Sequence, residues 1–211
     1  MKRFLLLTAA VFAFGAFTTS SFAEDAKVLP AEHYNFDKAH TQILFFVDHL
    51  GFSTSQGEFL GYDGSFDFDN EHPEKSSVDI TIQSASIDMD DTPWDDHMKS
   101  KDFFNVEEFP TMTFKSTEIK VTGRETADIT GDFTLLGITK PVTLKVKHNK
   151  SGKHAFSGKY VSGFSATTQL KRSDFGMVYG LPMIGDDIDI RIEVEGIRDD
   201  QADEAKEEVK E

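Results

Sequence analysis

The residues with the clearest chemical potential lie in one turn, Arg172-Ser173-Asp174-Phe175-Gly176, directly after a strand-like segment. An arginine fork donates two parallel hydrogen bonds to a carboxylate or a pyrophosphate, so Arg172 and its neighbours Ser173 and Asp174 are a candidate site for an anionic group. The same residues fit a turn stabilised by an Arg172–Asp174 ion pair, because most surface ion pairs carry no function. The sequence leaves both interpretations open.

Histidines are the other side chains that change charge near neutral pH. His49 lies on the apolar face of a predicted strand, so it is either a donor to a bound polar group or a structural histidine. His40 follows Asp37 by three residues and is predicted to brace the turn between the first two strands.

The chain lacks the spacings of common catalytic and metal-binding motifs. It has no cysteine, no Gly-x-Ser-x-Gly elbow and no His-Glu-x-x-His sequence. Its 7 histidines are scattered among 37 acidic residues, so pairs such as Asp37 with His40 and Asp96 with His97 arise by chance. Neither pair has the ligand count of a metal site, and the sequence predicts no catalytic residue, metal or cofactor.

The N-terminus has the three parts of a secretory signal peptide. Lys2 and Arg3 are basic, Phe4–Phe17 is apolar, and Ser21-Phe22-Ala23 fits a cleavage site. The apolar run is shorter than the roughly 20 residues that a membrane-spanning helix needs. We therefore expect export, with a signal peptide over 1–23, a linker over 24–31, one domain over 32–198 and an acidic disordered tail over 199–211.

Composition narrows the function classes further. An exported chain without cysteine must be held together by burial and strand pairing, which excludes a small disulfide scaffold. The formal net charge of −15 becomes more negative once Lys2 and Arg3 are removed. Such acidity argues against nucleic acids and anionic surfaces as partners.

Segments of period-two hydrophobicity follow one another from about Ala31 and predict half-buried strands. Between 188 and 194, four apolar residues alternate with charged ones. Turn signals separate the segments at 70–74, 121–124, 149–152 and 181–182. The inward positions of the earlier segments include Ile43, Phe45, Val47 and His49; Tyr62, Gly64, Phe66 and Phe68; Val78, Ile80 and Ile82; Met112 and Phe114; Ile129, Phe133 and Leu135; Val142, Leu144 and Val146; and Phe164, Ala166 and Thr168.

One segment breaks this pattern. Asp91-Thr92-Pro93 resembles an N-cap with proline in the first turn, which predicts a short helix ending near Phe103. On this helix, Trp94, His97 and Met98 either cover one end of the fold or pack as ordinary helix residues.

About eight antiparallel strands and one short helix predict an all-β fold, an extended eight-stranded antiparallel barrel. An eight-stranded barrel is just wide enough to be filled by side chains or to hold one slender ligand. The 20 phenylalanines fit a solid core as well as a lined tube.

Four phrases in order resemble the YceI-like family of periplasmic polyisoprenoid-binding proteins, over about Glu32 to Arg198. Thr41 is a departure, because the family usually has serine after the histidine, and the hydroxyl is kept. The phrases are FDKAHTQILFFVDHLGFSTSQGEF (36–59), DDHMKSKDFFNVEEFPTMTFKST (95–117), LLGITKPVTL (135–144) and KRSDFGMVYGLPMIGDDIDIRIEVEG (171–196).

The resemblance implies a lipocalin-like barrel in the periplasm that binds and transports a polyisoprenoid or other long-chain lipid and is not an enzyme. Its head group would meet Arg172, Asp174 and His49. The tail would lie against Phe45, Phe66, Phe68, Ile80, Ile82, Phe114, Phe133, Leu135, Leu144 and Phe164.

Alternatives from other classes are a quinone-binding redox or stress accessory of a membrane cytochrome system, and an enzyme that acts on its bound lipid. The expected ligand is an isoprenoid, a quinone or a fatty lipid, without a resident cofactor. A transient membrane-protein partner and a homodimer are further candidates as partners.

Overall fold

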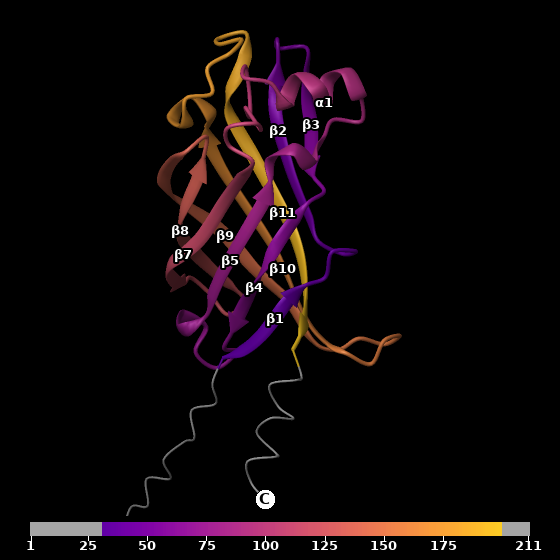
Figure 1. Ribbon diagram of the computed structural model, residues 1–211. Coiled ribbons are helices and arrows are strands. Elements are labelled where there is room, and N and C mark those ends of the chain that lie inside the picture. The colour runs from indigo at the N-terminus through magenta and orange to yellow at the C-terminus, as the bar shows by residue number, and fades with distance from the viewer. Residues whose placement is uncertain (1–30, 200–211) are drawn as a thin grey trace, which may run out of the picture.

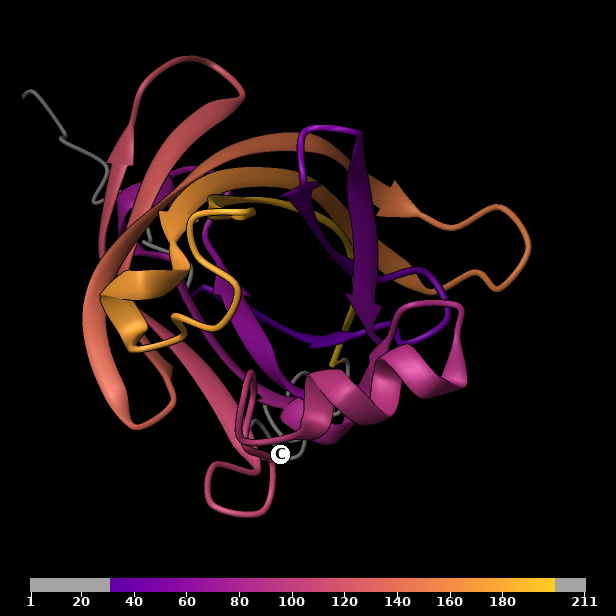
Figure 2. The same cartoon turned by 90° about the horizontal axis from the view of Figure 1, so that it is seen from above.

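The structure is a computed structural model that describes residues 31–199. It is an elongated antiparallel barrel with one helix lying beside its upper end (Figures 1 and 2). The predicted signal peptide (1–23), most of the linker (24–31) and most of the tail (199–211) lie outside the described residues. Within the described range, no helix has the length and hydropathy needed to cross a membrane.

The described chain contains strands throughout, one α-helix and three short 3₁₀ helices. The strands are β1 (Glu32–Phe36), β2 (Gln42–His49), β3 (Ser53–Phe59), β4 (Tyr62–Phe68), β5 (Ser77–Gln83), β6 (Ile87–Asp88), β7 (Thr111–Val121), β8 (Thr126–Leu135), β9 (Ile138–Lys153), β10 (Tyr160–Lys171) and β11 (Ile184–Arg198). The helices are α1 (Thr92–Lys99), η1 (Pro73–Lys75), η2 (Ser84–Ser86) and η3 (Arg172–Phe175).

Eight strands form a closed hydrogen-bonded ring in the order β1-β4-β5-β7-β8-β9-β10-β11, because β1 pairs with both β4 and β11. The long strand β11 pairs with β1 near its C-terminal end and with β2 along Ile184–Glu193. From β2 the sheet continues to β3 and β6 at the upper end. The predicted eight-stranded antiparallel barrel with one helix is confirmed.

Alternation produces this barrel, because inward and outward residues take turns along each strand. In β9, residues 142, 144, 146 and 148 are half-buried, whereas residues 141, 143, 145 and 147 are exposed. Two strands, β3 and β6, were absent from the sequence prediction. The segment Ser53–Phe59 is largely polar and has little periodicity of its own, and it becomes a strand by backbone pairing with β2.

Two predicted boundaries are wrong. The turn placed at 149–152 lies inside β9, which continues to Lys153, and the chain turns between His154 and Lys159 instead. A bulge between Gly163 and Phe164 of β10 keeps these strands paired. The helix ends at Lys99 rather than near Phe103, because Ser100 leaves helical geometry. Its predicted start is confirmed, since the Asp91 carboxylate accepts a hydrogen bond from the Trp94 backbone N–H at 3.0 Å.

Candidate functional site

The interior of the barrel is hollow. A cavity of about 570 Å³ runs along it, lined on the inward faces of the strands mainly by aliphatic and aromatic side chains. The lining extends from α1 and Ile184 at the upper end to Asn70 and Arg124 at the lower end. The inward rings therefore line a tube and do not fill a solid core.

All ten apolar residues that the sequence singled out for a pore line this cavity. Four of them, Ile80, Phe133, Leu144 and Phe164, are only half-buried although they point inward, because the cavity surface is accessible. Their contact with a lipid stays a prediction. The other six are buried: Phe45, Phe66, Phe68, Ile82, Phe114 and Leu135.

The upper mouth carries a group of aromatic and histidine side chains. His49, at the end of β2, faces Trp94 of α1 with ring centroids 6.1 Å apart. The ring of His97 meets that of Tyr179 edge-on, with centroids 5.3 Å apart, and His97 Nε2 lies 3.1 Å from Asp102 Oδ2. All four rings line the cavity, so this end offers both apolar surface and polar ring atoms.

Arg172 lines the cavity but is only 3% exposed, and its guanidinium is held by the backbone. Nε donates to the Gly185 carbonyl at 2.7 Å, while Nη1 and Nη2 donate to the carbonyls of Met177 and Ile184, each at 3.1 Å. Burial lowers the pKa of the Arg172 guanidinium, and the charge of Asp186 opposes this. These bonds fix the segment between η3 and β11 at the upper mouth.

The Arg172–Asp174 pair considered from the sequence does not form. Asp174 does not line the cavity and pairs with Lys140, Nζ to Oδ1, at 3.4 Å. Asp186 instead accepts hydrogen bonds from the Ser173 backbone N–H at 2.9 Å and hydroxyl at 2.8 Å. Asp174 and Arg172 are neighbours in sequence, but Asp174 is exposed beside Lys140 whereas the Arg172 guanidinium is buried.

The lower part of the cavity contains a histidine that the sequence analysis missed. His148 lines the cavity between Phe68 and Phe164, with ring centroids 5.1 Å from each. Burial lowers the pKa of His148, while the charge of Glu125 and a hydrogen bond to the Lys150 carbonyl oppose this. The period-two series 142, 144, 146 continues to 148, directly before the predicted turn, so alternation alone could have located it.

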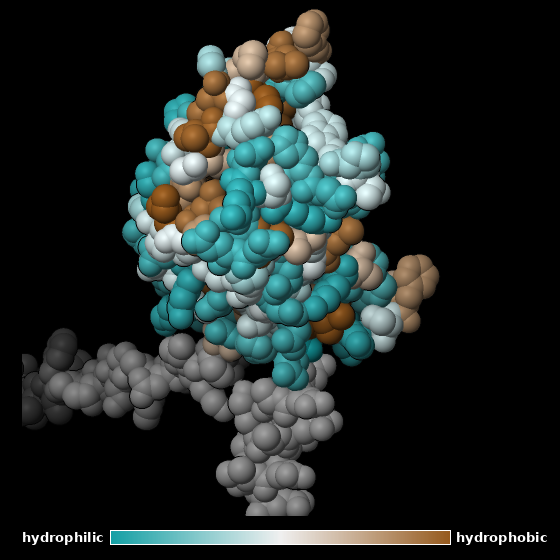
Figure 3. Space-filling model, turned by 45° about the horizontal axis from the view of Figure 1, so that its top comes forward, coloured by the Kyte–Doolittle hydropathy of each residue, from teal (hydrophilic) through white to brown (hydrophobic). Residues whose placement is uncertain are grey.

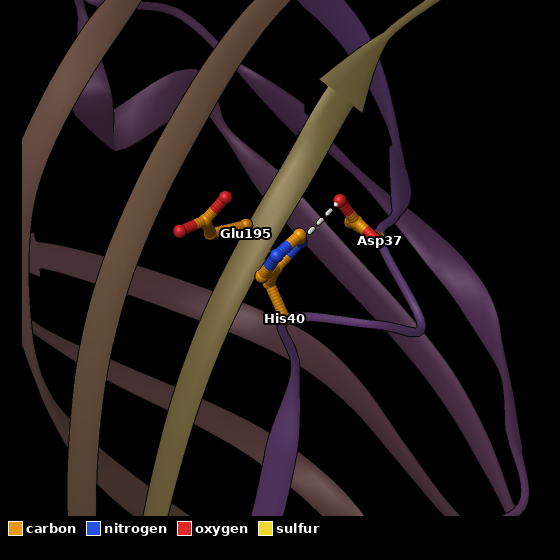
Figure 4. A group of neighbouring side chains, drawn as sticks. All are labelled: Asp37, His40 and Glu195. Atoms are coloured by element: carbon orange, nitrogen blue, oxygen red, sulfur yellow. Dashed lines mark hydrogen bonds and ion pairs between the residues drawn. The ribbon is translucent and has the colours of Figure 1, made fainter. Parts of the chain in front are cut away.

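Asp37, His40 and Glu195 lie together outside the cavity (Figure 4), with ligand atoms within 4.8 Å of one another. Among residues 31–199 they form the one group of this kind able to hold a metal ion. Asp37 accepts from the Ala39 N–H and contacts His40 Nδ1, both at 2.9 Å, so the predicted bracing of this turn is confirmed. The hydrogen bond and charge of Asp37 raise the pKa of His40.

Residues 34–196 match the model of the YceI-like domain. The chain belongs to the YceI-like family. The relatives include a UPF0312 protein from Ectopseudomonas mendocina and one from Pseudomonas aeruginosa. Each is 42% identical over 170 residues, which is 80% of this chain and 88% of the relative.

Solved structures share the barrel of this YceI-like chain. A YCEI protein from Campylobacter jejuni is 32% identical, covers 72% of this chain and 90% of its own, and superposes with a TM-score of 0.66. BcnA from Burkholderia cenocepacia shares the fold at 24% identity and a TM-score of 0.70, over 76% of this chain and 98% of its own. A polyisoprenoid binding domain from Saccharophagus degradans shares the fold at 10% identity and a TM-score of 0.60, over 80% of this chain and 99% of its own.

Proposed function

We propose that this protein is an exported, non-enzymatic binding protein that holds a polyisoprenoid or other long-chain amphiphilic lipid in its barrel. The observation that carries the proposal is the apolar cavity of about 570 Å³, which lies within the usual range for small-molecule sites. Transfer of a hydrocarbon chain from water into such a cavity contributes about 0.8 kcal/mol per methylene. About ten buried methylenes therefore supply roughly 8 kcal/mol before the cost of ordering the chain.

The tail lies against the rings and aliphatic side chains of β2, β4, β5, β7, β8, β9, β10 and β11. The head group sits at the upper mouth, where His49 is one of the polar side chains that line the cavity. Arg172 contributes mainly by holding that mouth in shape, because its donors already serve three backbone carbonyls.

We propose a carrier role in the periplasm, which the expected signal peptide and the fold shared with a polyisoprenoid binding domain support. We propose a binding role without catalysis because the arginine at the mouth is engaged in structural hydrogen bonds. Binding and release of lipid, with no bond made or broken, is the chemistry that these side chains support.

Native mass spectrometry of protein purified from its host without detergent tests the proposal. We expect an additional mass of several hundred daltons, and extraction then separates an isoprenoid, a fatty lipid and a quinone. If the protein carries no ligand and binds neither geranylgeraniol nor the fluorescent fatty acid parinaric acid, the proposal is wrong.

A matched pair of variants on β9 locates the ligand. Leu144 points into the cavity and Lys145 points outward on the same strand. Leu144→Trp places a large ring in the tube and is expected to weaken parinaric acid binding about tenfold or more, since it displaces several buried methylenes. Lys145→Trp is expected to leave binding unchanged. Equal effects of the two variants would place the ligand outside the barrel.

A further inference from the structure

The upper end of the barrel exposes apolar side chains that the fold does not need for its core. We define the apolar tip as the side chains Leu50, Phe52, Trp94, Val178, Tyr179 and Met183. Phe52 is 89% exposed and Met183 is 65% exposed. Of the ten large hydrophobic side chains exposed among residues 31–199, six belong to this tip. Figure 3 shows hydrophobic side chains gathered at this end above a largely hydrophilic flank.

The two turns that carry five of the six tip side chains are free of formal charge, whereas the sixth, Trp94, lies on α1 next to Asp95 and Asp96. No Asp, Glu, Lys or Arg occurs from His49 to Gly57 or from Phe175 to Gly185, in a chain with 22 basic and 37 acidic residues. The charges that flank these turns are set back and engaged. Asp48 accepts from the Gly51 N–H at 3.0 Å, and Asp186 is bonded to Ser173.

Backbone geometry and hydrogen bonds fix the two turns that carry most of these side chains. Leu50 and Gly51 both have positive φ, at 58° and 72°, in the tight turn between β2 and β3, which the Phe52 N–H closes by donating to the His49 carbonyl at 3.0 Å. Leucine adopts this conformation less readily than glycine because its Cβ crowds the following carbonyl oxygen. The Leu50 N–H donates to the Met183 carbonyl at 3.2 Å, so the two turns form one unit, which Arg172 fixes from below.

The tip is continuous with the cavity, because Trp94 and Tyr179 are both exposed and part of the cavity lining. The lower end differs, since Arg124 and Glu125 line the cavity there. A hydrocarbon chain that leaves the cavity past the tip stays in contact with apolar surface. At the lower end it would have to pass charged side chains.

We propose that the apolar tip docks into the surface of a zwitterionic phospholipid bilayer, with Phe52, Leu50 and Met183 entering the interfacial layer. This inference rests on the proposed lipid-binding function and gives the lipid a path between bilayer and cavity that avoids water. The two uncharged turns of the tip enter a bilayer without transferring charge from water. The net charge of −15 repels anionic membranes, which makes a zwitterionic surface the matching partner.

Flotation with phosphatidylcholine vesicles tests docking, and Trp94 reports it independently because it is the sole tryptophan. We expect the protein to float with the vesicles, and Trp94 emission to shift to the blue and be quenched by brominated lipids. Phe52→Ser combined with Met183→Ser should lower the partition coefficient about tenfold or more, since both side chains lose burial in lipid. Replacing a third of the lipid by phosphatidylglycerol at low salt should weaken binding.

Phe156 provides the matched control. It is 96% exposed on the turn between β9 and β10, which projects from the barrel near its lower end (Figure 1). Phe156→Ser should leave vesicle binding unchanged. Equal losses at Phe52 and Phe156, no binding by the unmodified protein, or sedimentation as a dimer that buries the tip would each overturn the proposal.

Parinaric acid binding separates this proposal from the proposed function. The tip variant should retain its affinity for the soluble probe, because the cavity lining is intact. A protein that binds the probe but no vesicle lacks docking alone. A protein that binds vesicles through Phe52 but not the probe keeps docking and loses the cavity function.

Discussion

Nε of Arg172 donates a hydrogen bond of 2.7 Å to the backbone carbonyl of Gly185, thirteen positions further along the chain. Together with the bonds to Met177 and Ile184, it closes the segment between η3 and β11 around one buried cation. Arg172, although it lines an apolar cavity, therefore stabilises the conformation of the segment that forms the upper mouth.

Replacement of Arg172 by lysine should destabilise the protein. Lysine keeps the charge but cannot reach three carbonyls with a planar fork. Since a hydrogen bond to a charged group contributes about 1.5–3 kcal/mol, we expect a loss of about 3 kcal/mol in the free energy of unfolding, measured by urea denaturation. The exposed Arg191, which bonds to Glu193, is the control, and Arg191→Lys should cost less than about 1 kcal/mol. Unchanged stability with lost lipid affinity would instead make Arg172 a head-group ligand.

His148 should make stability depend on pH in a defined direction. Its pKa is lowered in the folded state, so the unfolded chain binds the proton more readily. The stabilising contribution is therefore present above about pH 6.5, the ordinary value for histidine, and is lost as pH falls through the lowered pKa.

The comparison of wild type with His148→Gln at several pH values checks this. Glutamine does not titrate and can still bond to Ser151, which lies 2.8 Å from His148 Nε2. The stability of the wild type relative to the variant should decline as pH is lowered below about 6.5. A difference that stays constant with pH would show that the proton binds equally in both states.

Much of this fold could be read from alternation, because an inward face and an outward face leave a strict pattern in each barrel strand. That pattern located the ten apolar residues that were assigned to a pore, all of which line the cavity. It could not decide between a solid core and a tube, since that depends on whether facing rings such as Phe66 and Phe164 meet across the barrel. The ring centroids of these two residues lie 5.4 Å apart near the lower end, and a cavity still runs along the barrel.

The mouth was harder to predict for a different reason. Its geometry depends on backbone carbonyls that converge on Arg172 from five to thirteen positions further along the chain. Every residue has a carbonyl, so the amino-acid sequence does not show which of them accept these hydrogen bonds. The sequence marked Arg172 as chemically capable without showing that its donors were engaged. Edge elements such as β3 and β6 were missed because backbone pairing alone defines them.

Gly64 of β4 should be intolerant of any side chain. Its φ is 148°, and a Cβ atom there would meet the Asp79 carbonyl oxygen and approach the Ile80 Cα to 2.9 Å on the neighbouring strand β5. We expect Gly64→Ala to lower the free energy of unfolding by about 1–3 kcal/mol. In contrast, a Cβ at Gly163 has its nearest neighbour at 3.7 Å, so Gly163→Ala should change stability little. Similar losses at both positions, measured by urea denaturation, would argue against the β4–β5 contact.

Removal of the α1 cap should loosen the upper mouth while the barrel stays intact. The Asp91 carboxylate satisfies the Trp94 N–H, and Asp91→Ala removes this acceptor at an expected cost of about 1 kcal/mol, within a range of 0.5–2. Because Trp94 is the sole tryptophan and lines the mouth, its emission should shift to the red as α1 frays. Amide hydrogens of α1 should exchange faster, while those of β9 and β10 keep their protection.

Asp96 is the control for this change, since it is exposed on the same helix beyond the cap. Asp96→Ala should alter stability by less than about 0.5 kcal/mol and leave Trp94 emission unchanged. If the helix covers the entrance, the rate of release of parinaric acid should increase in Asp91→Ala and stay constant in Asp96→Ala. Faster exchange in α1 without faster release would show that the probe leaves the cavity by a route that avoids this helix.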